Sequence, residues 1–410
     1  MKIEIHVLQN FAPSNLNRDD TGAPKDCELG GVRRARISSQ CLKRAIRDAF
    51  ENHALVAEAH RAARTKRIVE NVAKIVAEKR GVDLERAQKA VTTALGGAGL
   101  KADPEKEWKT QYLLFVPSRV VHELAEVVTT HYDTLTQEAD AAKAVDGEKK
   151  PAKATAKRAK SDAKDAVPRE VASAVEALLK DASRTPELAL FGRMIADAPD
   201  WNMEAACQVA HAVSTHRVAV EFDFYTAIDD LKKDDTAGSD MMGTISFNSA
   251  CFYRYLVVDT SALTKNLGDG AHGAAQARET ARALIRAAVL AIPTGKQNSM
   301  AAHNLPSFVM VDVREGAESR SLTNAFVDPV RAKPGEAGDL VSQSIHKLGK
   351  HHSAVEKVYG NKGQKDLSFV AVGESEDVAR AFVKQTGATD RSSLDALIAA
   401  SVDAAFGVTT

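Results

Sequence analysis

The first fifty residues join three elements in an order that constrains the fold more than any other stretch. Residues 2–8 alternate between apolar and polar side chains, which predicts a strand with one buried and one solvated face. A loop rich in Asn, Asp, Gly and Pro follows from about Asn10 to Val32. Either Ser38 or Ser39 can then cap a helix, because a serine oxygen accepts the free N–H groups of a first helical turn.

The start of this helix carries a local excess of positive charge. Between Val32 and Arg47 there is no acidic residue, and the cations are Arg33, Arg34, Arg36, Lys43, Arg44 and Arg47. The whole protein has 55 Lys and Arg against 55 Asp and Glu, so the excess is local. A helix N-terminus surrounded by cations suits a phosphate group, and we expect a contact with an RNA backbone here. The alternative is a solvated basic helix face without a ligand.

Helical spacing divides this segment into two faces. The apolar positions that recur at this spacing predict a buried stripe, namely Leu42, Ala45, Ile46, Ala49 and Phe50. Lys43 and Arg47 are four residues apart and are expected together on a solvent-facing side.

Two long strands near the middle of the chain predict a projecting arm. Residues 218–224 alternate, with Phe222 and Phe224 on one face, and residues 243–258 form the second strand after a polar turn at 232–243. Met241 and Met242 lie at the predicted tip, where an apolar side chain requires a partner such as an unstacked base. The alternative is that both methionines fold back onto the hairpin, and simple core packing is the alternative for Phe224.

The last third of the chain alternates helices with strands and indicates an α+β fold. The predicted helices are 274–292, 339–359, 376–386 and 391–406, and the strands are 308–314 and 367–372. No segment resembles the aromatic RNA-stacking signature RGFGFVxF, so an RNA-binding domain here would use loops and helix ends. The polar loop 293–304 offers Lys296 and Ser299 as phosphate contacts, and an ordinary turn is the alternative.

Between these parts the pattern is mainly helical. Helices are predicted within 55–80, ended by Gly81, and at 84–95, 119–131 and 205–215, with a strand or core segment at 188–195. Residues 139–167 are rich in Ala and Lys with almost no large apolar side chain, which predicts a linker.

The sequence offers little support for catalysis or a bound cofactor. It contains no GxxxxGK[ST] motif, and Gly268–Gly273 matches a dinucleotide fingerprint by letters alone. His211 and His216 lack a nearby third ligand, and the four cysteines show no metal spacing, so we expect neither a metal nor a cofactor. No apolar run approaches the length of a membrane span, so a cytoplasmic protein without a membrane partner is expected.

Four co-linear segments carry a specific resemblance: HVLQNFAPSNLNRDDTGAPKD, LGGVRRARISSQCLKRAIR, QVAHAVSTHRVAVEFDFYTAIDDL and FNSACFYRY. Together they resemble the CasC-type backbone subunit of Cascade, the type I-E CRISPR effector complex. The resemblance is strongest in residues 1–50 and 187–258 and weak between 52 and 180.

The resemblance implies an α+β fold with an RRM-like (ferredoxin-like) palm, a helical fingers insertion and a β-hairpin thumb. The implied boundaries are 1–51, 182–216 and 248–410 for the palm, 52–181 for the fingers and 217–247 for the thumb. It also implies a non-catalytic, multi-copy protein whose partners are a guide crRNA, target DNA through the RNA–DNA heteroduplex, neighbouring copies and other Cascade subunits.

Transferred onto this sequence, the resemblance implies two groups of functional residues. The RNA-binding group is Arg18, Lys25, Ser38, Gln40, Lys43, Arg47, Lys296 and Ser299. The group that braces or interrupts the base stack is Met194, Phe224, Tyr225 and Met242. One alternative is a metal-dependent ribonuclease of the same superfamily, using Asp26 or Asp20 in the first loop, and another is a general single-strand binder.

Overall fold

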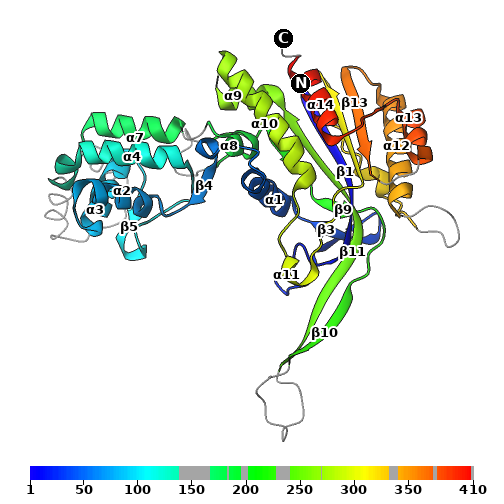
Figure 1. The fold of residues 1–410 in the computed structure, drawn as a ribbon, viewed down its shortest axis with the longest axis horizontal. Coiled ribbons are helices and arrows are strands. Elements are labelled where there is room, and N and C mark those ends of the chain that lie inside the picture. Colours follow the sequence, from blue (N-terminus) through cyan, green and yellow to red (C-terminus); the bar gives the residue numbers. More distant parts are fainter. Residues whose placement is uncertain are drawn as a thin grey trace, which may run out of the picture. The chain divides into compact units, whose positions relative to one another are not determined.

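The computed structural model describes residues 1–137, 167–181, 184–194, 202–227, 241–268, 270–331, 340–372 and 376–407. It is a mixed α+β protein in two compact units (Figure 1). The first unit comprises Met1–Leu55, Cys207–Ala262 and Ala275–Thr410, and the second comprises Val56–Ala206 and Leu263–Ala274. None of the described helices combines the length and apolarity needed to cross a bilayer.

The first unit is built on one mixed sheet with the strand order β14-β13-β12-β1-β11-β9-β3-β2. At its centre, β1 (Lys2–Ser14) runs antiparallel to both β11 (Met241–Asp259) and β12 (Phe308–Arg314). Only β13 and β14 pair in parallel within this sheet as described. The other strands are β2 (Asp26–Leu29), β3 (Val32–Ile37), β8 (Cys207–Val209), β9 (Ala212–Ser214), β10 (Glu221–Ala227), β13 (Gln364–Ala371) and β14 (Thr389–Asp390).

Strand β1 is present but is buried on both faces, so the prediction that one of its faces is solvated is wrong. Ile3 and Ile5 lie on one face as expected, but Glu4 and His6 on the other face are only 1% and 2% exposed. Glu4 Oε2 accepts a hydrogen bond from the Tyr255 hydroxyl at 2.7 Å, and His6 Nδ1 lies 2.8 Å from the Tyr253 hydroxyl. The predicted loop is also shorter, because β1 continues to Ser14 and β2 and β3 form a hairpin within the range.

Helices cover the sheet and complete its core. They are α1 (Ser39–Asn52), α10 (Gly270–Leu290), α12 (Leu340–Tyr359), α13 (Glu376–Thr386) and α14 (Leu394–Phe406). Under α12, Ile345 and Leu348 join Leu8, Phe308 and Phe369 of the sheet in one apolar cluster. The stripe predicted for α1 is confirmed, since the same five residues are its buried positions.

The predicted helix at 205–215 is wrong, because this segment forms strands β8 and β9. Both pair with β11, through residues 256–258 and 252–253. The nineteen-residue β11 offers backbone partners along its edge, and this long-range pairing overrides the local helical pattern. Residues 188–190 are buried core as predicted, but they belong to the short helix α8 (Pro186–Phe191) rather than to a strand.

The second unit is mainly helical and has its own core. Its longer helices α2 (Ile68–Arg80), α3 (Leu84–Gly97), α4 (Ser118–Thr130) and α7 (Arg169–Asp181) enclose a shared apolar cluster. Gly81 ends α2 with φ 65°, as the sequence predicts. This unit also contains four short strands, β4 (Ala62–Thr65), β5 (Ala102–Asp103), β6 (Lys109–Thr110) and β7 (Leu114–Pro117). Residues 263–267 of helix α9 (Thr260–Leu267) belong to it as well. The predicted linker lies outside the described residues except for Val167.

Candidate nucleic-acid interface

The N-terminus of α1 is built by side chains that hold the first loop against the helix. Ser38 is the N-cap, and its Oγ accepts a hydrogen bond from Cys41 N–H at 3.3 Å. Its own N–H donates to Asn17 Oδ1 at 2.8 Å, which links the helix start to the loop. Ser38 is only 6% exposed, whereas the neighbouring Gln40 is exposed. Any contact made by Ser38 with a bound molecule is therefore confined to a small surface.

The cations near this helix do not form one free cluster. Arg33 forms an ion pair with Asp26, and Arg44 pairs with Asp48 at 3.1 Å. Lys43 and Arg47 are half-buried rather than fully solvent-facing, which corrects the expectation for that side of the helix.

Arg34 is a structural residue and not part of the surface charge. It is fully buried, and its guanidinium donates to the carbonyl oxygens of Ser214 at 3.1 Å, Phe326 at 2.7 Å and Val327 at 3.2 Å. Burial lowers the pKa of Arg34 from its usual value. The cationic run seen in the sequence thus divides into a buried part and a surface part.

The structure brings the first loop, helix α1 and the loop 293–301 together. Arg18, Arg44 and Gly295 line one cavity of about 480 Å³. Gly295 approaches the backbone of Leu16 so closely that an added Cβ would overlap its carbonyl group. This contact holds the segment carrying Lys296 and Ser299 beside the loop that carries Arg18.

Lys25, Lys296 and Ser299 occupy the edges of this region. Lys25 is half-buried, and its backbone lies between Asn17 and Arg36, since its N–H donates to the Asn17 carbonyl at 2.9 Å and its carbonyl accepts from Arg36 N–H at 2.9 Å. Lys296 has φ 53° and precedes the four-residue helix α11 (Gln297–Met300). Ser299 is exposed, and its Oγ donates to the Lys296 carbonyl at 3.3 Å.

The hairpin of β10 and β11 presents an exposed apolar face and extends away from the rest of the sheet (Figure 1). Its register pairs Thr226 with Met242 and Phe224 with Thr244, so Phe224 and Met242 share a face. Phe224 is 63% exposed and Met242 is 67% exposed, which excludes core packing for Phe224 and a folded-back Met242. Of the turn predicted at 232–243, residues 232–240 lie outside the described residues, and residues 241–243 belong to strand β11 instead, with Met241 described only as a strand residue.

Phe224 and Tyr225 point to opposite faces, because consecutive strand residues alternate. The ring of Tyr225 packs over its cross-strand partner Gly243. Phe222 lies on the same face as Phe224, as the alternation predicts, and is 72% exposed. Met194 belongs to the second unit and is 88% exposed.

His211 is a member of the interface that the sequence reading missed. It lies between β8 and β9, and its Nδ1 is 3.3 Å from both Ser39 N and Arg36 Nη1. Assigning residues 205–215 to a helix concealed this position. The strand-like alternation of residues 207–214 was the one available signal. His216, by contrast, is tied into the backbone at Arg217 and Cys251.

Asp26 and Asp19, two acids of the first loop, have structural partners, whereas Asp20, the other acid considered for catalysis, is exposed and lines the cavity with Arg18. Asp26 pairs with Arg33, and Asp19 Oδ1 accepts hydrogen bonds from the N–H groups of Thr21 and Ala23 at 2.9 Å and 3.0 Å. The Thr21 hydroxyl also donates to Asp19, and these bonds lower the pKa of that carboxyl. Both acids are thus bound into the loop.

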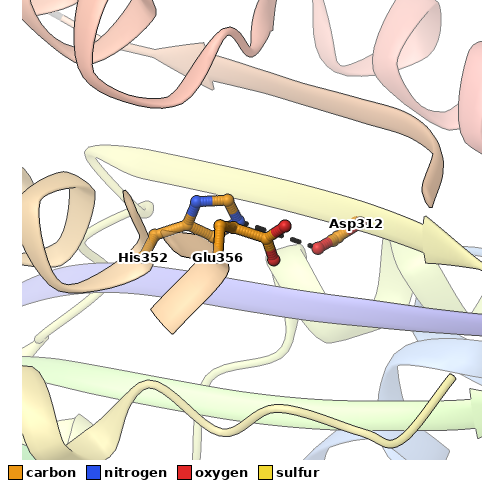
Figure 2. Close-up of side chains that lie close together, drawn as sticks. All are labelled: Asp312, His352 and Glu356. Atoms are coloured by element: carbon orange, nitrogen blue, oxygen red, sulfur yellow. Dashed lines mark ion pairs between the residues drawn. The ribbon is translucent and has the colours of Figure 1, made fainter. Parts of the chain in front are cut away.

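One group among the described residues has the spacing of a metal site: the buried Asp312 and His352 with the half-buried Glu356 (Figure 2). His352 Nε2 lies 3.8 Å from Asp312 Oδ2. However, Arg314 Nη2 lies 2.5 Å from Asp312 Oδ2 and 2.5 Å from Glu356 Oε1. Arg320 Nη1 also lies 2.7 Å from Glu356 Oε1, so two guanidinium groups balance the two carboxylates in an ion-pair network.

Comparison with known proteins places the chain in a family. No curated protein matches it. Two solved structures are similar along nearly all of it, covering 99% of this chain and 100% of theirs. One, described as "CRISPR RNA-guided surveillance complex, pre-nicking", has 30% identity and a TM-score of 0.80. The other, "CRISPR RNA-guided surveillance complex", has 25% identity and a TM-score of 0.71. The family described as CT1975-like protein matches residues 3–400, and this chain therefore belongs to that family.

Proposed function

We propose that this chain is a multi-copy, crRNA-binding backbone subunit of a type I-E CRISPR Cascade. In this role it holds the guide RNA for pairing with target DNA in antiviral defence. The observation that carries the proposal is the similarity of 99% of the chain, at a TM-score of 0.80, to a CRISPR RNA-guided surveillance complex. The CT1975-like family match over residues 3–400 covers the same span.

The geometry of the first unit supports phosphate binding without base readout. Arg18, Lys25, Ser38, Gln40, Lys43 and Arg47 with Lys296 and Ser299 are the proposed contacts. Cations, hydroxyls and helix N–H groups bind phosphate oxygens and carry no sequence information. A guide held this way presents its bases for pairing, so sequence would be read by the RNA itself.

The division into palm, fingers and thumb is part of the proposal. The order β12-β1-β11-β9, with α10 crossing from β11 to β12, supports an RRM-like palm. The mainly helical second unit supports fingers, and the β10–β11 hairpin supports a thumb. Phe224, Tyr225 and Met242 on the thumb, with Met194, would brace or interrupt the base stack. Neighbouring copies and other Cascade subunits are the proposed partners in the cytoplasm.

We infer a non-catalytic role, which the ion pair of Asp26 with Arg33 supports. The test is incubation of the assembled complex with complementary RNA and Mg²⁺. The complementary strand should remain intact. Periodic cuts that disappear in Asp26→Ala would instead establish the ribonuclease alternative.

The decisive experiment for RNA binding is co-expression of the chain with a CRISPR repeat–spacer transcript, followed by purification. The expected product has a mass several times that of the chain, an absorbance ratio showing nucleic acid, and RNA of defined length. The product is then challenged with excess unrelated RNA. Exchange of the guide for unrelated RNA would establish a general single-strand binder, and a purified chain free of RNA would refute the proposal.

A further inference from the structure

The hydrogen bonds around His211 fix which ring nitrogen carries the proton. Nδ1 lies 3.3 Å from the Ser39 backbone N–H and 3.3 Å from Arg36 Nη1. Both neighbours are donors that cannot accept, so Nδ1 is the unprotonated, accepting nitrogen. The ring hydrogen therefore resides on Nε2.

The surroundings also keep His211 uncharged. Burial, Arg36 and Lys25 all lower the pKa of this imidazole. Its side chain is nevertheless exposed, and Nε2 makes no hydrogen bond with any residue that the structure describes. His211 thus supplies a neutral, outward N–H donor within a group of cations.

We propose that His211 is a further RNA-contact residue, which donates its Nε2–H to a phosphate oxygen of the bound strand. The inference rests on the proposed function, because it takes RNA as the ligand of this region. Nδ1 orients the ring by accepting from Ser39 and Arg36, and Nε2 contacts the ligand. A neutral donor releases no counterion, so this contact should add affinity without adding to the salt dependence.

Two isosteric substitutions separate the two nitrogens. His211→Asn places a carbonyl oxygen where Nδ1 accepts, so it retains the contact with Ser39 and loses the outward donor. His211→Gln places an amide N–H₂ near the position of Nε2, so it retains the donor and loses the acceptor. Lys43→Ala serves as a reference for loss of a charged contact. Each full-length variant is titrated with labelled single-stranded RNA of mixed sequence at several salt concentrations, and its thermal unfolding midpoint is measured.

We expect His211→Asn to weaken RNA binding roughly 2- to 10-fold, the range of one neutral hydrogen bond, with the slope of log K against log salt unchanged. His211→Gln should bind nearly as the wild type and unfold at a lower temperature. Lys43→Ala should weaken binding and reduce the slope by about 0.7, the single-strand value for one contact.

The outcomes distinguish this inference from the proposed function. Wild-type affinity in His211→Asn beside weakened binding in Lys43→Ala would overturn the role of His211 alone. Loss of binding in His211→Gln but not in His211→Asn would assign His211 a purely structural role. Absence of RNA binding by the wild-type protein would overturn the proposed function itself, and this inference with it.

Discussion

At the scale of single residues, neighbours in the sequence have opposite environments. Arg33 and Arg34 adjoin in β3, where side chains alternate between faces. Arg33 has a side chain that is 63% exposed, and its ion pair with Asp26 lies in water. Arg34 is enclosed and donates to three backbone carbonyls. The same guanidinium group is thus a surface charge at one position and a structural link at the next.

Substitution of these two arginines should therefore affect stability very differently. Arg34→Gln removes donors from buried carbonyls and is expected to lower the free energy of unfolding by about 2–4 kcal/mol. Arg33→Gln, the matched control, should cost less than about 1 kcal/mol because exposed ion pairs contribute little. Urea unfolding of both variants measures the difference, and equal costs would contradict this account of Arg34.

The buried network at Asp312 should shape the dependence of stability on pH. Burial alone would raise the pKa of Asp312, but the nearby His352 and the charge and hydrogen bond of Arg314 hold it below its usual range. A lowered folded-state pKa gives stability that is present above the unfolded value of about 3.9 and lost as pH falls through the folded value. Burial raises the pKa of Glu4. The contribution of Glu4 to the free energy of unfolding therefore depends on pH in the opposite direction to that of Asp312, and it is lost as pH rises.

Asp312→Asn should consequently lower stability at neutral pH and flatten the loss of stability on acidification. Urea unfolding between about pH 3 and pH 7 would record both effects. Asp377→Asn, at an exposed residue of α13, is the control and should leave the profile unchanged. If Asp312→Asn lost stability at acid pH to the same extent as the wild type, Asp312 would not contribute to that loss.

Individual site residues were predictable only where the cause is local. A serine cap at position 38 or 39 and the apolar stripe of α1 follow from sequence spacing, and the structure has Ser38 as the cap and the same stripe. The burial of Arg34 depends on carbonyls at residues 214 and 326–327, which no local pattern reveals. Glu4 and His6 were predicted as solvated for the same reason, since their partners lie some 250–320 residues away along the chain.

At the scale of elements, boundaries set by local signals were predictable and those set by pairing were not. Strand β12 and helix α13 have the predicted bounds. Strands β8 and β9 exist because β11 offers them backbone partners, and this pairing prevails over the helical pattern of the segment. The loop 293–301 was identified as polar, but its contact with the first loop depends on packing at Gly295.

That packing gives a direct test of how the two loops are held together. Gly295→Ala would bring a methyl group onto the Leu16 carbonyl, so the loops must separate. We expect lower stability of the first unit and weaker RNA binding than in the wild type. Gly96→Ala in α3 is the control, because an added Cβ there has open space and alanine favours a helix. Tight RNA binding retained by Gly295→Ala would show that the contact is dispensable for the interface.

The hairpin should tolerate substitution without loss of folding. Met242 is 67% exposed, so Met242→Ser is expected to change the free energy of unfolding by less than about 0.5 kcal/mol.

In the complex assembled on a guide, the fluorescence of 2-aminopurine placed at successive positions reports unstacked bases. We expect periodic maxima in the wild type that decrease in Met242→Ser. Leu305→Ser, also an exposed apolar residue, should leave them unchanged, and maxima that persist in Met242→Ser would exclude a wedge role for this residue.

At the scale of the whole molecule, the two units have separate apolar cores. Leu348 of α12 belongs to the core of the first unit, and Leu124 of α4 belongs to that of the second. Units with separate cores unfold in separate steps when few contacts couple them. The fold class followed from the alternation of helices and strands, but the assignment of Leu263–Ala274 to the second unit required the tertiary structure.

Matched substitutions in the two cores should show this independence. Leu348→Ala and Leu124→Ala each remove a buried side chain and should cost about 2–5 kcal/mol. Scanning calorimetry is expected to resolve two transitions, with each variant lowering only one of them. A single transition that shifts equally in both variants would show that the chain unfolds as one cooperative body.

The exposed face of the hairpin has a consequence for the protein when nothing covers it. Phe222, Phe224 and Met242 expose large apolar side chains along one ribbon. An exposed apolar surface of this kind associates with the same surface on another chain, so the unoccupied chain should be prone to self-association. The yield of non-aggregated protein should therefore be higher when the ligand that covers the hairpin is present during synthesis than when it is added afterwards.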